Sequence, residues 1–187
     1  MSSVTDIPGF TAGTWVIDPV HSEIAFSVRH LMVSKVRGRF ETFEGEIVTT
    51  DDILDTQATV TVDLRSINTG NEDRDNDLRS ANYFEVDKYP TMTFRSTSIK
   101  AEGDRFVAEG DLTVKGTSRS VPLQVEFNGI SPDPWGGTRA GLSATGEINR
   151  KDFGLTFDMP MEGGGVVVGD RIKLELEVEA VLQTSAT

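Results

Sequence analysis

The chain has 187 residues, no cysteine and a formal net charge of -12, with 30 acidic residues against 18 basic ones. This length suits a single domain, and the absence of cysteine excludes disulfides, thiolate metal sites and thiol nucleophiles. The acidic excess repels phosphate groups, so nucleic-acid binding is not expected.

The N-terminal residues 1–13 are polar, contain glycine and proline, and are expected to form a flexible tail. They have neither the basic region nor the apolar run of a signal peptide, and no later segment approaches the length of a membrane span. From these features we expect a cytoplasmic protein without stable membrane insertion.

The first strands follow in residues 14–17 and 23–30, where Ile24, Phe26, Val28 and His30 alternate with Ala25, Ser27 and Arg29. A turn at residues 31–34 leads into a second arm over residues 36–50, and residues 58–64 alternate again. A glycine inside the second arm, Gly38, is typical of a bend or of close backbone approach. The pattern therefore predicts a strongly bent antiparallel sheet.

Residues 66–89 lack alternation and predict one short helix, near residues 71–84, that crosses an end of the sheet. Asn71 or Asp73 is a suitable N-cap, and acidic residues in the first turn favour the helix dipole. Leu78, Ala81 and Phe84 have the spacing of a short apolar stripe.

Strand patterns return over residues 91–99, 105–114, 121–127, 139–148 and 171–181. The short connections exclude a parallel sheet, so the fold is all-β, either a sandwich or an up-and-down barrel. Several apolar faces use small residues, which either leave room for a ligand or face large partners; the pattern alone leaves both possibilities open. These small residues are Ala108, Gly110, Ala140, Ala144 and Gly146.

Few residues offer catalytic or metal chemistry. His21 and His30 are the two histidines, and no nucleophile-elbow motif accompanies them. The acidic run 73–77 begins like a calcium loop but continues with Leu78, where such a loop needs glycine. We therefore predict no catalytic residue, no metal site and no cofactor.

The chain resembles the YceI-like family of bacterial proteins in four segments that follow one another in the family's order. These segments are residues 15–45, 66–97, 110–123 and 148–154. The resemblance extends over residues 15–180. It implies a single eight-stranded antiparallel lipocalin-like β-barrel over residues 14–182. It also implies an apolar tunnel that binds a polyisoprenoid, such as an isoprenoid quinone or a polyprenyl phosphate, without enzymatic activity. Many relatives have a histidine where this chain has Asp77, and many are periplasmic.

From strand alternation and this resemblance we expect a bound isoprenoid lipid to contact two groups of side chains. The tunnel residues are Phe26, Val28, Phe40, Phe43, Val62, Leu64, Phe94, Leu112, Leu142 and Leu176, and the mouth or headgroup residues are His21, His30, Arg74 and Arg150. Two alternatives stay open: a small-molecule enzyme or isomerase that uses His21 or His30 in the cavity, and an interaction scaffold with a solid core. An exposed loop at Trp135 would suit a homodimer contact.

Overall fold

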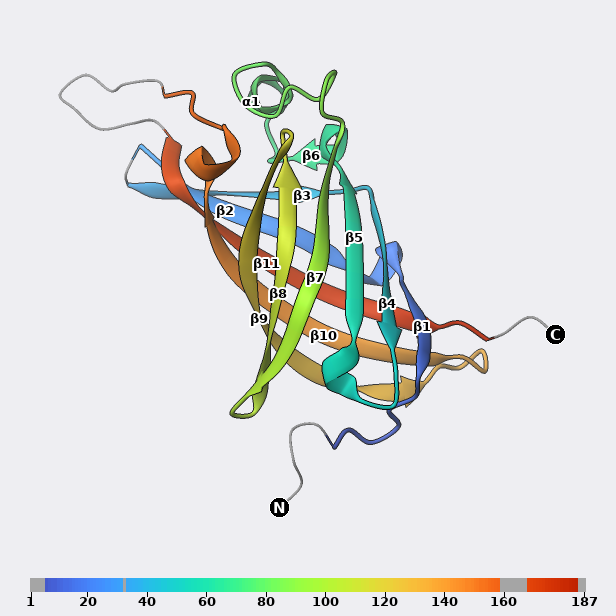
Figure 1. Cartoon of the computed structure of the whole chain (residues 1–187). Coiled ribbons are helices and arrows are strands. Elements are labelled where there is room, and N and C mark those ends of the chain that lie inside the picture. Colours follow the sequence, from blue (N-terminus) through green and yellow to red (C-terminus); the bar gives the residue numbers. More distant parts are fainter. Residues whose placement is uncertain (1–5, 32, 159–167, 185–187) are drawn as a thin grey trace.

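The computed structural model describes residues 6–31, 33–158 and 168–184. Within these residues the chain forms eleven β-strands, one α-helix and four short 3₁₀ helices. The strands curve around one another, and the helix lies across one end of them (Figure 1). The strands are β1 (Gly13–Ile17), β2 (Glu23–His30), β3 (Ser34–Phe40), β4 (Phe43–Thr49), β5 (Gln57–Asp63), β6 (Ile67–Asn68), β7 (Thr91–Glu102), β8 (Arg105–Val114), β9 (Thr117–Pro132), β10 (Thr138–Asn149) and β11 (Val168–Leu182).

Eight of these strands close into a ring in the order β1-β4-β5-β7-β8-β9-β10-β11, and β11 pairs with β1 to complete it. Every pairing is antiparallel. The predicted eight-stranded antiparallel barrel is therefore confirmed. The last residues of β11 pair with β1, whereas its earlier part pairs with β2, so β2 and β3 continue the sheet beyond the ring.

The alternation of side chains decides which strand face is inside the barrel. In β11, Leu174, Leu176 and Val178 face the interior, while Lys173 and Glu175 point to solvent. Because neighbouring strands are in register, the inward residues of β10 lie beside those of β11, as Ala144 does beside Leu176. A continuous apolar interior follows from this register.

The helix α1 spans Glu72–Arg79. The Asn71 side chain accepts a hydrogen bond from the Arg74 amide at 2.9 Å, so Asn71 is the N-cap of the two candidates, and Asp73 lies inside the first turn. The helix is shorter than expected because Ser80 caps it, and Ala81 lies exposed beyond its end. Among the described residues, no helix is long and apolar enough to cross a membrane.

Packed apolar side chains close the barrel at the end where α1 lies, which we call the helix end (Figure 1). Leu64, Ile67 and Phe153 are the largest side chains that are fully buried, with 0%, 1% and 1% of their surface exposed. Tyr83, after the helix, packs edge-on against Phe157 with ring centroids 5.6 Å apart. Among the described residues, packed side chains therefore fill the helix end, and the cavity extends from there toward Phe10 and Ile130 at the opposite end.

Candidate functional site

An apolar cavity of about 230 Å³ lies inside the barrel. Its wall is built from β1, β2, β4, β5 and β7 through β11. Phe10 is added from the N-terminal residues, and Ile53 and Thr56 from the 3₁₀ helix Ile53–Asp55 and its end. Aliphatic, aromatic and methionine side chains line it together with Thr49, Thr56 and Thr93, and no charged side chain of the described residues takes part. Such a wall suits an uncharged, chain-like guest.

The small residues that the sequence left ambiguous divide into two groups. Ala108, Ala140 and Ala144 line the cavity and leave space there. The space beside Gly110 is occupied by the Phe94 ring, and the space beside Gly146 by the Leu123 side chain. The alanines therefore create room for a guest, whereas these glycines accommodate large neighbours.

The end opposite α1 is the mouth of the cavity, and residues 6–12, which we call the N-terminal segment, lie across it. The Phe10 side chain lines the cavity, and Gly9 sits against Ile130 of β9. On the other side, Thr49 of β4 donates a hydrogen bond from Oγ1 to the Thr11 carbonyl at 2.8 Å. Because β4 and β9 lie on opposite sides of the eight-stranded ring, the segment spans the mouth.

Thr49 also organises the rim of the mouth. Its Oγ1 accepts hydrogen bonds from the Gly13 amide and from Trp15 Nε1, both at 3.1 Å. The Trp15 ring is 3% exposed and lines the cavity, so this bond satisfies its one polar atom in an apolar wall. Phe10 and Trp15 are not among the site residues expected from sequence, because Phe10 falls in the predicted tail and Trp15 in a short first strand whose inward face was not assigned.

Five of the ten predicted tunnel residues line the cavity: Val62, Phe94, Leu112, Leu142 and Leu176. Three others, Phe40, Phe43 and Leu64, are buried in the packed cluster at the helix end, where Phe26 packs on Phe40 with ring centroids 5.5 Å apart. Val28 is half-buried between its strand partners Val36 and Ile172. The alternation of apolar and polar residues identified the inward face of these strands. Contact of the ten predicted residues with a ligand remains a prediction.

The structure does not bring the four predicted mouth residues together at the mouth. Arg74 lies on α1 and donates from Nε to Thr69 Oγ1 at 2.8 Å and from Nη2 to the Thr69 carbonyl at 2.7 Å. His30 ends β2, beside the turn into β3 and opposite Val168. Neither residue is among those that line the cavity, and contact of either with a headgroup remains a prediction.

Arg150 also lies at the helix end, and only 2% of it is exposed. Its guanidinium donates to the carbonyls of Leu155, Phe157 and Gly169 at 2.6, 2.9 and 3.0 Å, and to the Asp158 carboxylate at 2.5 Å. Protein groups therefore satisfy this side chain, and it ties residues 155–158 to the start of β11. In the structure Arg150 is therefore a buried support for these segments, and its contact with a headgroup remains a prediction.

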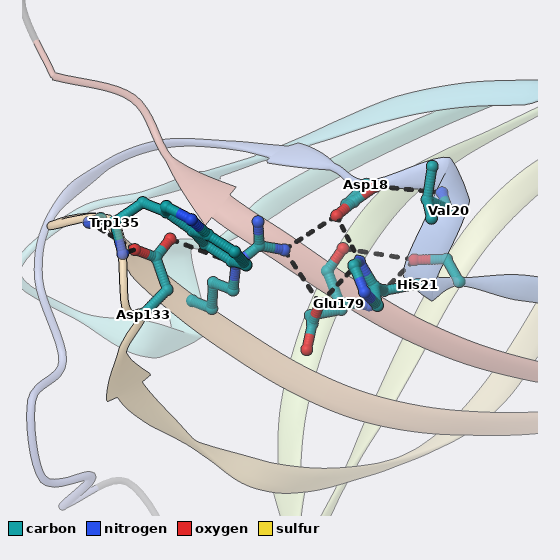
Figure 2. Close-up of polar contacts among 9 residues, drawn as sticks. Asp18, Val20, His21, Asp133, Trp135 and Glu179 are labelled. Atoms are coloured by element: carbon teal, nitrogen blue, oxygen red, sulfur yellow. Dashed lines mark hydrogen bonds and ion pairs between the residues drawn. The ribbon is translucent and has the colours of Figure 1, made fainter.

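His21 belongs to a polar cluster on the outer wall of the barrel (Figure 2). Its Nδ1 lies 2.7 Å from Asp18 Oδ2, and Asp18 Oδ1 accepts the Val20 amide at 3.0 Å. Arg139 Nη1 donates to Asp18 Oδ2 at 2.8 Å and to Glu179 Oε2 at 2.9 Å. Because Val178 and Ala180 line the cavity, Glu179 between them points outward.

Arg139 is the central cation of this outer-wall cluster and pairs with Asp18, Asp133 and Glu179. Its hydrogen bond to Asp18, helped by His21, lowers the pKa of that carboxyl from 3.8 to about 2. Donor atoms of Asp18, His21 and Glu179 lie close enough to hold a metal ion. However, Arg139 already donates to the same two carboxylate oxygens, so the arrangement is an ion-pair network. Neither Arg139 nor Glu179 was singled out from the sequence.

Comparison with known proteins agrees with this architecture. The family described as "YceI-like domain" matches residues 15–180. The UPF0312 protein SA2479 of Staphylococcus aureus is 39% identical over 170 residues, which cover 88% of this chain and 95% of that protein.

Among solved structures, the Campylobacter jejuni YCEI protein superposes with a TM-score of 0.72 at 31% identity, covering 83% of this chain and 90% of that one. A polyisoprenoid binding domain from Saccharophagus degradans gives a TM-score of 0.69 at 16% identity, covering 92% of this chain and 100% of that one. Because the family match extends over residues 15–180 and a relative is 39% identical over 170 residues, this chain belongs to the YceI-like family.

Proposed function

We propose that this protein binds a long isoprenoid lipid in its barrel cavity, for carriage, storage or sequestration. The observation that carries the proposal is the apolar barrel cavity, whose lining has no charged side chain among the described residues. Membership of the YceI-like family and the fold shared with a polyisoprenoid binding domain support it. Each buried CH₂ of a prenyl chain contributes about 0.8 kcal/mol, so a long chain can bind tightly through its tail alone.

The surroundings of the mouth favour an uncharged headgroup, such as a quinone, over a phosphate. Thr49 Oγ1 is already bonded to protein groups, and Thr56 Oγ1 donates to the Ile53 carbonyl at 2.6 Å. Ile53, which lines the cavity, directly follows Asp52 and lies two positions before Asp55. A phosphate held here would lose hydration and meet like charge, whereas a neutral ring would not.

The two tryptophans provide a direct test. Trp15 lines the cavity, whereas Trp135 is 81% exposed in the β9–β10 loop, so the Trp135→Phe variant reports on the cavity alone. We expect an isoprenoid quinone to quench its fluorescence saturably and a polyprenyl phosphate to compete weakly. A quinone without its prenyl chain, titrated as the control, should not saturate.

Mass spectrometry of organic extracts from protein purified without detergent should detect the natural ligand. Absence of any extracted lipid, together with no saturable quenching, would exclude the lipid-binding proposal. Saturable quenching with a phosphate that competes as strongly as the quinone would exclude the preference for a neutral headgroup and leave the binding of the chain in place.

The two alternatives require other arrangements. An enzyme that uses an imidazole in the cavity needs His21 or His30 in the wall, but His21 lies on the outer wall and His30 at the end of β2. A scaffold with a solid core would not enclose the observed cavity. A ligand recovered chemically changed after incubation with the protein would favour the enzyme.

A further inference from the structure

The outer face of β2, β3 and the start of β11 collects basic side chains in an otherwise acidic protein. Arg29 lies directly opposite Lys35, while Arg37 and Lys173 flank Ser27 from either side. These side chains share one face because paired residues on neighbouring strands point the same way. We call this the basic patch; it consists of Arg29, Lys35, Arg37, Arg39, Arg171 and Lys173, six of the 18 lysines and arginines.

The patch keeps a local positive charge although acidic residues enter it. Glu175 lies 3.0 Å from Arg37 and 3.8 Å from Lys173, and Glu147 and Glu41 each pair with one further cation of the patch. Six cations and three carboxylates leave +3, whereas the whole chain carries -12. Arg29 and Lys35, the two cations nearest the β2–β3 turn, form no ion pair with any described carboxylate.

The turn beside these two cations presents apolar side chains to solvent. Val33 is 82% exposed and Leu31 is 38% exposed, and the turn is closed by a hydrogen bond from the Val33 amide to the His30 carbonyl at 3.2 Å. Leu31 has a φ of 54°, a conformation that glycine or asparagine adopts at lower cost. A bulky apolar residue here therefore serves neither the turn nor the core.

We propose that the β2–β3 hairpin docks the protein on an anionic lipid bilayer. The hairpin extends beyond the eight-stranded ring beside the start of β11 (Figure 1). Leu31 and Val33 enter the interface, as apolar side chains of peripheral proteins do, and the basic patch contacts the anionic headgroups. The net charge of -12 repels such a bilayer elsewhere and so orients this face toward it.

This inference rests on the proposed function, because a protein that exchanges an isoprenoid lipid must meet the bilayer that holds it. The proposal is for peripheral docking, which needs no membrane-spanning segment. In this proposal both the basic patch and the two apolar side chains, Leu31 and Val33, contact the bilayer. Because salt screens the attraction between the patch and the headgroups, binding should weaken as salt is added.

Co-sedimentation of the full chain with vesicles tests the docking. We expect binding to vesicles of phosphatidylcholine mixed with phosphatidylglycerol, and little binding to phosphatidylcholine alone. A lysine or arginine near the surface changes binding about fivefold, so the double variant Arg29→Gln, Lys35→Gln should bind roughly 30-fold more weakly. Val33→Ser should also weaken binding, by about fivefold.

The matched control variants remove the same kinds of side chain, two cations or one exposed valine, from other parts of the surface. Lys100→Gln with Arg105→Gln removes two exposed cations from the β7–β8 hairpin, and Val20→Ser removes a side chain that is 85% exposed. Both controls should bind vesicles like the unchanged protein. Equal losses in control and patch variants, equal binding to neutral vesicles, or salt-sensitive binding to DNA without binding to vesicles would each overturn the docking proposal.

The docking proposal and the cavity proposal can be refuted independently of each other. Quenching of Trp15 by a quinone delivered from cyclodextrin requires no vesicle, and the patch variants should retain it. Retained quenching without vesicle binding would refute docking alone. Vesicle binding without quenching would refute the cavity proposal on which docking rests.

Discussion

Filling the cavity from its wall should weaken lipid binding by a calculable amount. Ala144 is 4% exposed, lines the cavity, and is paired with Val125 of β9 and Leu176 of β11. The change Ala144→Leu adds three carbon atoms to this space, which displaces about three CH₂ equivalents of the bound chain. At about 0.8 kcal/mol for each buried CH₂, the loss is about 2.4 kcal/mol, or roughly a 60-fold increase in Kd.

The assay is the titration of a long-chain quinone against Trp15 fluorescence in the Trp135→Phe background. Ala101→Leu is the matched control, because Ala101 is exposed on β7 and does not line the cavity. Thermal unfolding should show that Ala144→Leu is at least as stable as its parent, since the new side chain fills space in the unliganded barrel. An unchanged Kd in a folded Ala144→Leu protein would refute the placement of the ligand in this cavity.

Three further predictions concern the mouth, the buried arginine and the outer-wall cluster. Phe10→Ala should speed both uptake and release of the quinone in stopped-flow measurements, because the N-terminal segment covers the mouth; unchanged rates would contradict this role. Arg150→Lys should lower the free energy of unfolding by about 3–5 kcal/mol in urea titrations, since lysine cannot replace the buried guanidinium contacts; a loss below 1 kcal/mol would contradict it. Asp18 stabilises the fold above its unfolded pKa of 3.8, and this contribution is lost as the pH falls toward about 2. The difference in unfolding free energy between the unchanged protein and Asp18→Asn should therefore shrink over that range, and a constant difference would contradict the assignment.

The sequence by itself determined the local elements, because their signals repeat within a few residues. β8 has the predicted bounds Arg105–Val114, and Asn71 caps α1 as its side chain chemistry requires. The period of two in β11 correctly separated its inward leucines from its outward charges. Specific segments spread over residues 15–180 then indicated the barrel, which local patterns had left undecided against a sandwich.

Only the tertiary structure decided how far along the barrel each inward residue lies. Leu64 and Leu112 both occupy apolar faces, yet Leu64 seals the helix end while Leu112 lines the cavity. Arg150 was expected to meet a headgroup, but carbonyl groups of neighbouring segments surround it. The alternation of residues along a strand shows which face of the sheet a side chain occupies. Its position along the barrel, the closing of the barrel end and the hydrogen-bond partners of a polar group depend on residues that are distant in sequence. The cavity, its mouth and the basic patch arise from those long-range contacts.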